Sequence, residues 1–217
     1  MILEISYQTQ NIPAPFAFSV IMKLEISKEV KMHFELSYLD REDLSEQEIL
    51  GEGFSLDDDL IWSGTLGNNW KEVLRNFSNL EMQNEPNEQF FLHIKIDDAT
   101  AGFPNVENDI IIQELIQAAF ERSGREEQLE IRFLKSEIQQ VLSWDFAQRA
   151  ASLDGLTFDW SLSYQLMELI YTRDFEKMKV LKQPINKSVM LGSEGWFLIE
   201  DQSVWTLVES IQARTEK

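Results

Sequence analysis

The chain has no cysteine and only two histidines among its 217 residues. Without cysteine there is no disulfide framework, no thiolate metal site and no cysteine nucleophile. Two histidines are too few for a zinc centre with three histidine ligands. The sequence also lacks the short motifs of P-loop, dinucleotide-binding, EF-hand, zinc-protease and nucleophile-elbow sites. These absences weigh against the enzyme classes that such motifs mark, and against those classes only.

Basic residues are scarce as well. There are 19 Lys and Arg against 38 Asp and Glu, which gives a net charge of -19. A chain of this charge is repelled by nucleic acid and by anionic membrane surfaces, so neither is expected as a partner. The densest apolar stretch, residues 110–120, is interrupted by Gln113, Glu114 and Gln117 and is too short and too polar to span a bilayer. No secretory signal is visible, and a cytoplasmic location is expected.

The apolar content is sufficient for a sizeable core. Hydrophobic residues make up 43% of the chain and aromatic residues 11%. A disordered chain would lack the apolar surface needed to offset the entropy lost on folding. We expect one compact α+β domain over residues 1–217, with a possible subdivision near residues 98–106 or 152–157.

Residues 2–39 alternate between apolar and polar with a period of two, the pattern of half-buried strands. Short breaks divide this region into three segments, whose apolar faces include Leu3, Met22 and Phe34. Three strands with short connections predict an N-terminal antiparallel β-meander. Further strands are expected near residues 90–97 and 195–200, joined to this meander and packed against several helices.

Helices are predicted from capping residues and from apolar spacing. Ser45 and Glu48 form a capping box for a short helix, and Trp70 begins an apolar stripe with helical spacing. Further helices are expected over residues 109–122, 163–182 and from residue 203 onward. Residues 128–134 fit either a strand or the start of a helix. A second capping box at residues 136–139 favours the strand, and it predicts a helix that continues to about residue 152.

The charge is unevenly distributed along the sequence. Residues 40–59 contain nine acidic residues and one base, Arg41, for a net charge of -8. Residues 81–109 have a net charge of -6, whereas residues 171–187 have a net charge of +3. The sequence therefore predicts concentrated negative charge, and leaves open whether the basic segment pairs with it.

Two acidic clusters are the candidate binding sites. Carboxylates at Asp57, Asp58 and Asp59 would suit a hard divalent cation if they converged with Glu52 or with the second cluster. Asp97 and Asp98 form that second cluster, where a predicted strand meets a loop. Runs of acidic residues are more often solvated surfaces, and Asp commonly forms turns through bonds to the following backbone. No metal site is therefore assigned and no cofactor is expected.

His33 and His93 both lie on the polar faces of predicted strands. If these strands were neighbours, the two imidazoles would meet and could serve in proton transfer. Two separate surface histidines are the commoner outcome of this pattern. No serine has a histidine within reach in the sequence, so a nucleophilic triad is not predicted.

The missing motifs and the concentrated negative charge favour a non-catalytic protein. We expect an acidic surface that binds a basic protein partner, because charge of one sign speeds and selects encounters with the opposite sign. Two alternatives remain open at this point. One is an enzyme with a carboxylate-bound divalent metal, and the other is a small-molecule binding module. The oligomeric state is not predicted.

Overall fold

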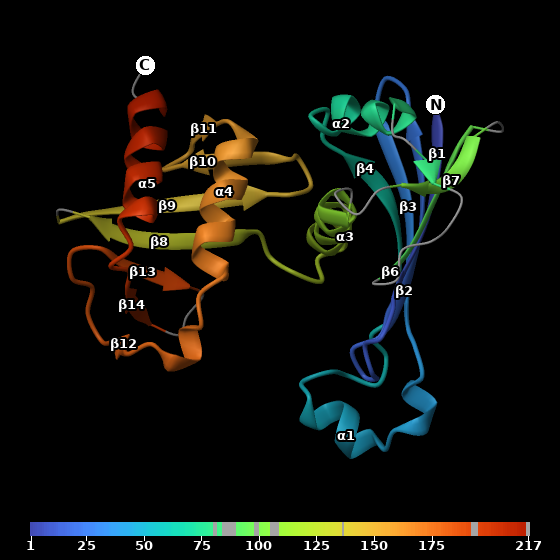
Figure 1. Cartoon of the computed structure of the whole chain (residues 1–217), viewed down its shortest axis with the longest axis horizontal. Coiled ribbons are helices and arrows are strands. Elements are labelled where there is room, and N and C mark those ends of the chain that lie inside the picture. Colours follow the sequence, from blue (N-terminus) through green and yellow to red (C-terminus); the bar gives the residue numbers. More distant parts are fainter. Residues whose placement is uncertain are drawn as a thin grey trace. The chain divides into compact units, whose positions relative to one another are not determined.

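The computed structural model describes residues 1–79, 82–83, 90–97, 100–104, 109–135, 137–191 and 195–215. It confirms the α+β class with an N-terminal antiparallel meander. The chain divides into two compact units, Met1–Ser123 and Gly124–Lys217 (Figure 1). Whether these units fold as one domain, as the sequence suggests, stays a prediction.

The first unit is built on a seven-stranded antiparallel sheet with the order β4-β3-β2-β1-β6-β7-β5. Its meander consists of the three strands predicted at the N-terminus, and the strand expected near residues 90–97 pairs with the first of them. The bounds are β1 (Ile2–Thr9), β2 (Phe18–Ile26), β3 (Val30–Tyr38), β4 (Leu60–Leu66), β5 (Met82–Gln83), β6 (Phe90–Ile96) and β7 (Thr100–Pro104).

One face of this sheet is buried and the other is open, as the period-two pattern requires. Leu3, Met22 and Phe34 are fully buried on the inner face. The long helix of the unit packs there, since the Phe34 and Phe120 rings meet edge to face with centroids 6.2 Å apart. Each large side chain removed from water in this way stabilises the fold by about 1.5–3 kcal/mol. The helices are η1 (Arg41–Asp43), α1 (Glu46–Gly51), α2 (Trp70–Asn76), η2 (Phe77–Asn79) and α3 (Asp109–Ser123).

The second unit contains another seven-stranded antiparallel sheet, with the order β11-β10-β9-β8-β13-β14-β12. The strand expected near residues 195–200 is present as β14, and it belongs to this second sheet. The strands are β8 (Leu129–Lys135), β9 (Ile138–Asp145), β10 (Ala150–Leu153), β11 (Leu156–Phe158), β12 (Val180–Leu181), β13 (Ser188–Leu191) and β14 (Trp196–Leu198). The helices are α4 (Trp160–Tyr171), the 3-10 turn η4 (Phe175–Lys177) and α5 (Gln202–Thr215).

The helix predicted over residues 136–152 is wrong, because this region forms the strands β9 and β10. Leu142 and Trp144 alternate inward here with Val141 and Ser143, a strand pattern that a short apolar run can share with a helix. Positive φ angles at Asp154 and Gly155 then allow the tight hairpin between β10 and β11. Residues 128–134, left open by the sequence, belong to strand β8. The helix expected over 163–182 is the shorter α4.

Candidate functional site

The most acidic part of the chain folds beyond the ends of the first sheet. Residues 39–59 connect β3 to β4 and include η1 and α1, which lies past the ends of β2 and β3 (Figure 1). The β1–β2 loop, residues 10–17, lies at the same end, because Thr9 and Phe18 are hydrogen-bonded neighbours. We call these two segments, 10–17 and 39–59, the end lobe.

Two local boxes of the Ser-x-x-acid type shape the longer segment of the end lobe. At the start of α1, the hydroxyl of Ser45 accepts from the backbone N–H of Glu48, and Glu48 Oε2 accepts from the Ser45 N–H at 2.8 Å. This is the predicted capping box, and it satisfies two helix-end donors. Ser55 and Asp58 form the second box, in which Asp58 accepts from the Ser55 N–H at 2.9 Å and from its hydroxyl at 2.7 Å.

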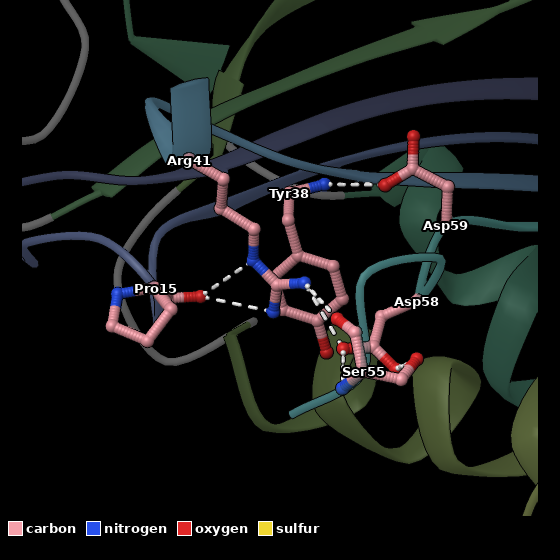
Figure 2. Close-up of polar contacts among 6 residues, drawn as sticks. All are labelled: Pro15, Tyr38, Arg41, Ser55, Asp58 and Asp59. Carbon is pink, nitrogen blue, oxygen red and sulfur yellow. Dashed lines mark hydrogen bonds and ion pairs between the residues drawn. The ribbon is translucent and has the colours of Figure 1, made fainter. Parts of the chain in front are cut away.

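Arg41 holds the end lobe together (Figure 2). Its Nε and Nη2 atoms each donate to the carbonyl oxygen of Pro15 at 3.2 Å, and Nη1 donates to the Ser55 carbonyl at 3.2 Å. The same Nη1 lies 3.0 Å from Asp58 Oδ2. The planar guanidinium is suited to such divergent bonds, because it presents several donors in one rigid group. One side chain therefore connects the β1–β2 loop to both ends of the longer segment.

Aromatic rings enclose the guanidinium of Arg41. Its central carbon lies 3.7 Å from the centroid of the Tyr38 ring and 4.5 Å from that of Phe54. The Tyr38 and Phe54 rings meet each other edge to face at 5.4 Å, and Phe16 contacts Phe54 at the same distance. Attraction between a cation and ring faces strengthens as water is excluded, and the Arg41 side chain is only 13% exposed.

Asp58 is therefore an internal partner of Arg41. Burial raises the pKa of this carboxyl, but the hydrogen bonds from Ser55 and Arg41 outweigh that effect and leave the pKa below its ordinary value of 3.8. The group stays ionised at neutral pH, and its charge is cancelled by Arg41. A side chain that is only 15% exposed and fully paired in this way has a structural role.

The remaining acidic residues of the end lobe keep their charge at the surface. Among the ion pairs in the described part of the chain, Asp58 is the only one of the nine acids that has a partner. Asp59 accepts a hydrogen bond from the Tyr38 N–H at 2.9 Å, which ties β4 to the end of β3. Seven acids are exposed and free of such ties to the sheet: Asp40, Glu42, Asp43, Glu46, Glu48, Glu52 and Asp57.

The second predicted cluster lies at the opposite end of the sheet. Asp97 Oδ1 accepts from the Ile2 N–H at 2.7 Å, and the Asp97 N–H donates to the Ile2 carbonyl at 2.8 Å. Asp97 is bonded to Ile2, at the first residue of β1, whereas Asp59 is bonded to Tyr38, at the other end of the sheet. The length of β1 therefore separates Asp97 from Asp59 by about 25 Å. Asp97 thus fastens the end of β6 to the start of β1, and Asp98 lies outside the described residues. The structure does not bring Asp97 to the three aspartates, and a binding role for Asp97 and Asp98 stays a prediction.

The two histidines do not meet. His33 is on β3 and His93 is on β6, with β2 and β1 between these strands. His93 lies against aromatic rings, with the Phe103 centroid at 5.4 Å. His33 instead contacts the hydroxyl of Ser63 on β4 and the carboxylate of Glu35.

Within the described ranges, no three His, Asp or Glu side chains gather in a way that could hold a metal ion. Two features of the end lobe could not be predicted from the sequence: the contacts of Arg41 with Asp58, Pro15 and Ser55, and the exposed apolar side chains. A lone arginine in an acidic run was visible, but the carbonyl of Pro15 and the ring of Phe54 reach it only through folding. Four large apolar side chains of the lobe are also exposed, by 44–54%: Ile12, Phe16, Leu50 and Leu56.

Comparisons with protein-family models, with curated proteins and with solved structures find no match to this chain. Among the described residues, no helix is long and apolar enough to cross a membrane.

Proposed function

We propose that the end lobe is a docking surface for a basic protein partner and that this binding is non-catalytic. One observation carries the proposal. Arg41, the only base of residues 40–59, is ion-paired with Asp58 inside the lobe. The other eight carboxylates of that segment therefore have no cation of the segment to offset their charge. A field of one sign at a protruding end attracts an oppositely charged protein and orients it during approach.

The construction of the lobe supports the same proposal. Surface charge that serves only solubility needs no fixed geometry. Here a partly buried ion pair, two aromatic rings, the capping box of α1 and the hydrogen bonds from Ser55 to Asp58 hold the acidic loops in place. A pre-ordered surface loses less conformational entropy on binding than a flexible one. The exposed apolar side chains of Phe16, Leu50 and Leu56 add contact area that becomes buried when a partner covers them.

The test compares two variants with the same change of net charge. The lobe variant carries Glu42→Gln, Asp43→Asn, Glu52→Gln and Asp57→Asn, four exposed carboxylates with no ion pair. The control carries Glu127→Gln, Glu137→Gln, Glu168→Gln and Glu200→Gln, four exposed carboxylates of the second unit. Asp58 is left intact in both, so that its ion pair with Arg41 is preserved.

Tagged wild-type protein and both variants are used for affinity capture from a lysate of their own source, with rising salt in the wash. We expect the wild type and the control to retain the same basic protein, which leaves at high salt because screening weakens the attraction. The lobe variant should not retain it. The association constant of the purified pair should then fall steeply with salt for the wild type and weakly for the lobe variant. Equal retention by the lobe variant, or a captured partner that is not basic, would refute the proposal.

A further inference from the structure

The open face of the first sheet brings a serine, a histidine and a glutamate into one hydrogen-bonded row. His33 on β3 is directly opposite Ser63 on β4, and Glu35 follows His33 on the same face of β3. His33 Nδ1 lies 2.7 Å from Ser63 Oγ, and His33 Nε2 lies 2.8 Å from Glu35 Oε1. Thirty residues separate the histidine from the serine, and strand pairing alone makes them neighbours.

The chemistry of these groups fixes the direction of the two hydrogen bonds when the imidazole is neutral. An ionised carboxylate can only accept, so Nε2 must carry the proton and donate it to Glu35. Nδ1 then has a free lone pair, and the hydroxyl of Ser63 donates to it. Glu35 therefore selects the tautomer in which His33 is ready to take the Ser63 proton, the arrangement that a general base needs.

Two members of this row, His33 and Ser63, line a shallow depression of about 390 Å³ on the open face. The depression is also lined by Thr65, Gly64 and two lysines, Lys23 and Lys31. Side chains of His33 and Glu35 are 43% and 45% exposed, so a small molecule can reach them. The charged side chains around the depression are of both signs, since Lys23 and Lys31 lie beside Glu25, and Lys23 Nζ is 4.0 Å from Glu4 Oε1.

We propose that Ser63 is a histidine-activated nucleophile that accepts an acyl group from a small activated ester. His33 is the general base, and Glu35 is a positioning residue that holds its tautomer. In the step, Ser63 Oγ forms a bond to the carbonyl carbon while its proton moves to His33 Nδ1. The bond from that carbon to the leaving oxygen breaks, and the leaving alcohol takes the proton from His33. The products are acylated Ser63 and the free alcohol.

This inference is independent of the proposed function, because no residue of the row belongs to the end lobe. The charged neighbours of His33 are Lys23 opposite it and Glu25 on the same face of β2, and Lys31 and Glu35 on its own strand. Its neighbours on the same face of β4 are Ser63 and the uncharged Ile61 and Thr65.

The test uses a fluorophosphonate reagent, which phosphonylates activated serines with loss of fluoride and a proton. The full chain is labelled, digested and analysed by mass spectrometry for the rate at each serine. Ser37 is the internal control, since it is an exposed serine on the same face of β3 as His33. The residue opposite Ser37 on β2 is Ser19, so no histidine of that strand faces it. General-base assistance is worth about 100-fold or more, so Ser63 should react at least about 100-fold faster than Ser37.

Variants separate activation from mere exposure. His33→Gln should reduce the rate at Ser63 to that at Ser37, and the Ser63 rate in the wild type should rise with pH through one ionisation. Glu35→Gln should slow Ser63 and alter that pH profile, whereas Glu35→Asp should restore part of the rate. Ser37 and Ser63 are exposed, and His33 and Glu35 are partly exposed, so these substitutions are not in the core. Equal melting temperatures of the variants and the wild type check that the fold is kept. Equal labelling of Ser63 and Ser37 in the wild type, or an unchanged Ser63 rate in His33→Gln, would overturn the proposal.

Discussion

Arg41 Nη1 lies 3.0 Å from Asp58 Oδ2, so the single base of the most acidic segment is neutralised by one of that segment's own acids. The same guanidinium donates to the carbonyls of Pro15 and Ser55 and lies against the Tyr38 ring. The pair therefore closes the end lobe and, by consuming the only cation of residues 40–59, leaves the outward surface with uncompensated negative charge. The Arg41–Asp58 contact thus both fixes the shape of the end lobe and determines the sign of its surface charge.

Removing either partner of this pair should destabilise the first unit. Arg41→Ala leaves Asp58 partly buried without its cation and leaves the Pro15 carbonyl without its donors, and we expect a loss of about 2–4 kcal/mol in the free energy of unfolding. Asp58→Asn should also destabilise, and the double variant should lose less than the sum of the two single changes. Urea unfolding measures these values. The exposed control Asp57→Asn should stay within about 0.5 kcal/mol of the wild type.

Asp201 should make stability depend on pH in the acid range. Hydrogen bonds from Ser203 at the start of α5 and from Arg173 lower its pKa from 3.8 to about 2. A lowered pKa means that the folded state prefers the ionised group, so the stabilisation is present above pH 3.8 and disappears as the pH falls through 2. Asp201→Asn should therefore be less stable than the wild type at pH 7, and the difference should vanish near pH 2. Urea unfolding from pH 2 to pH 7 measures this difference. The control Glu200→Gln should have the same free energy of unfolding as the wild type at every pH.

Tyr7 should ionise about two pH units later than an ordinary tyrosine. Burial and the nearby negative charge of Asp109 raise its pKa from 10.0 to about 12, against the opposing hydrogen bond from Gln113. Because the raised pKa favours the neutral form in the folded state, this contribution to stability is complete below pH 10 and is lost between pH 10 and pH 12. Ultraviolet absorbance of tyrosinate should show a late step that is absent in Tyr7→Phe. Asp109→Asn should shift the step to lower pH, and an unshifted step would contradict the role of Asp109.

Gly64 should not tolerate a side chain. A Cβ atom at this position would lie 2.3 Å from Cζ2 of Trp62, whose indole covers the glycine on the same face of β4. Gly64→Ala must displace the indole, and overpacking of this kind costs about 1–3 kcal/mol. Trp62→Ala removes the clash, so adding Gly64→Ala to that background should cost far less. Thermal unfolding of the single and double variants tests this, and an equal cost in both backgrounds would show that Trp62 is not the cause.

Much of the first unit could be predicted from local sequence. Alternation along residues 2–39 predicts the meander because a strand exposes successive side chains on opposite faces. Ser45 and Glu48 predict the start of α1 because a capping box is satisfied by residues three apart. In contrast, residues 138–145 carry apolar residues that fit both a helix and a strand, and β9 forms because β8 and β10 are available on either side of it. The spacing of apolar residues along this segment does not decide between helix and strand.

The candidate site divides in the same way. The sequence by itself determined the charge of residues 40–59, the isolation of Arg41 among acids and the strand faces on which His33 and His93 lie, because these depend on composition and on the period of a strand. Only the tertiary structure decided that Asp58 is consumed by Arg41, that Asp97 lies at the far end of the sheet from Asp59, and that Ser63 meets His33. These contacts follow from strand order and register, which are fixed by pairing between segments distant in the chain. Two strands lie between His33 and His93 and keep the histidines apart. The pairing of β3 with β4 places Ser63 directly opposite His33.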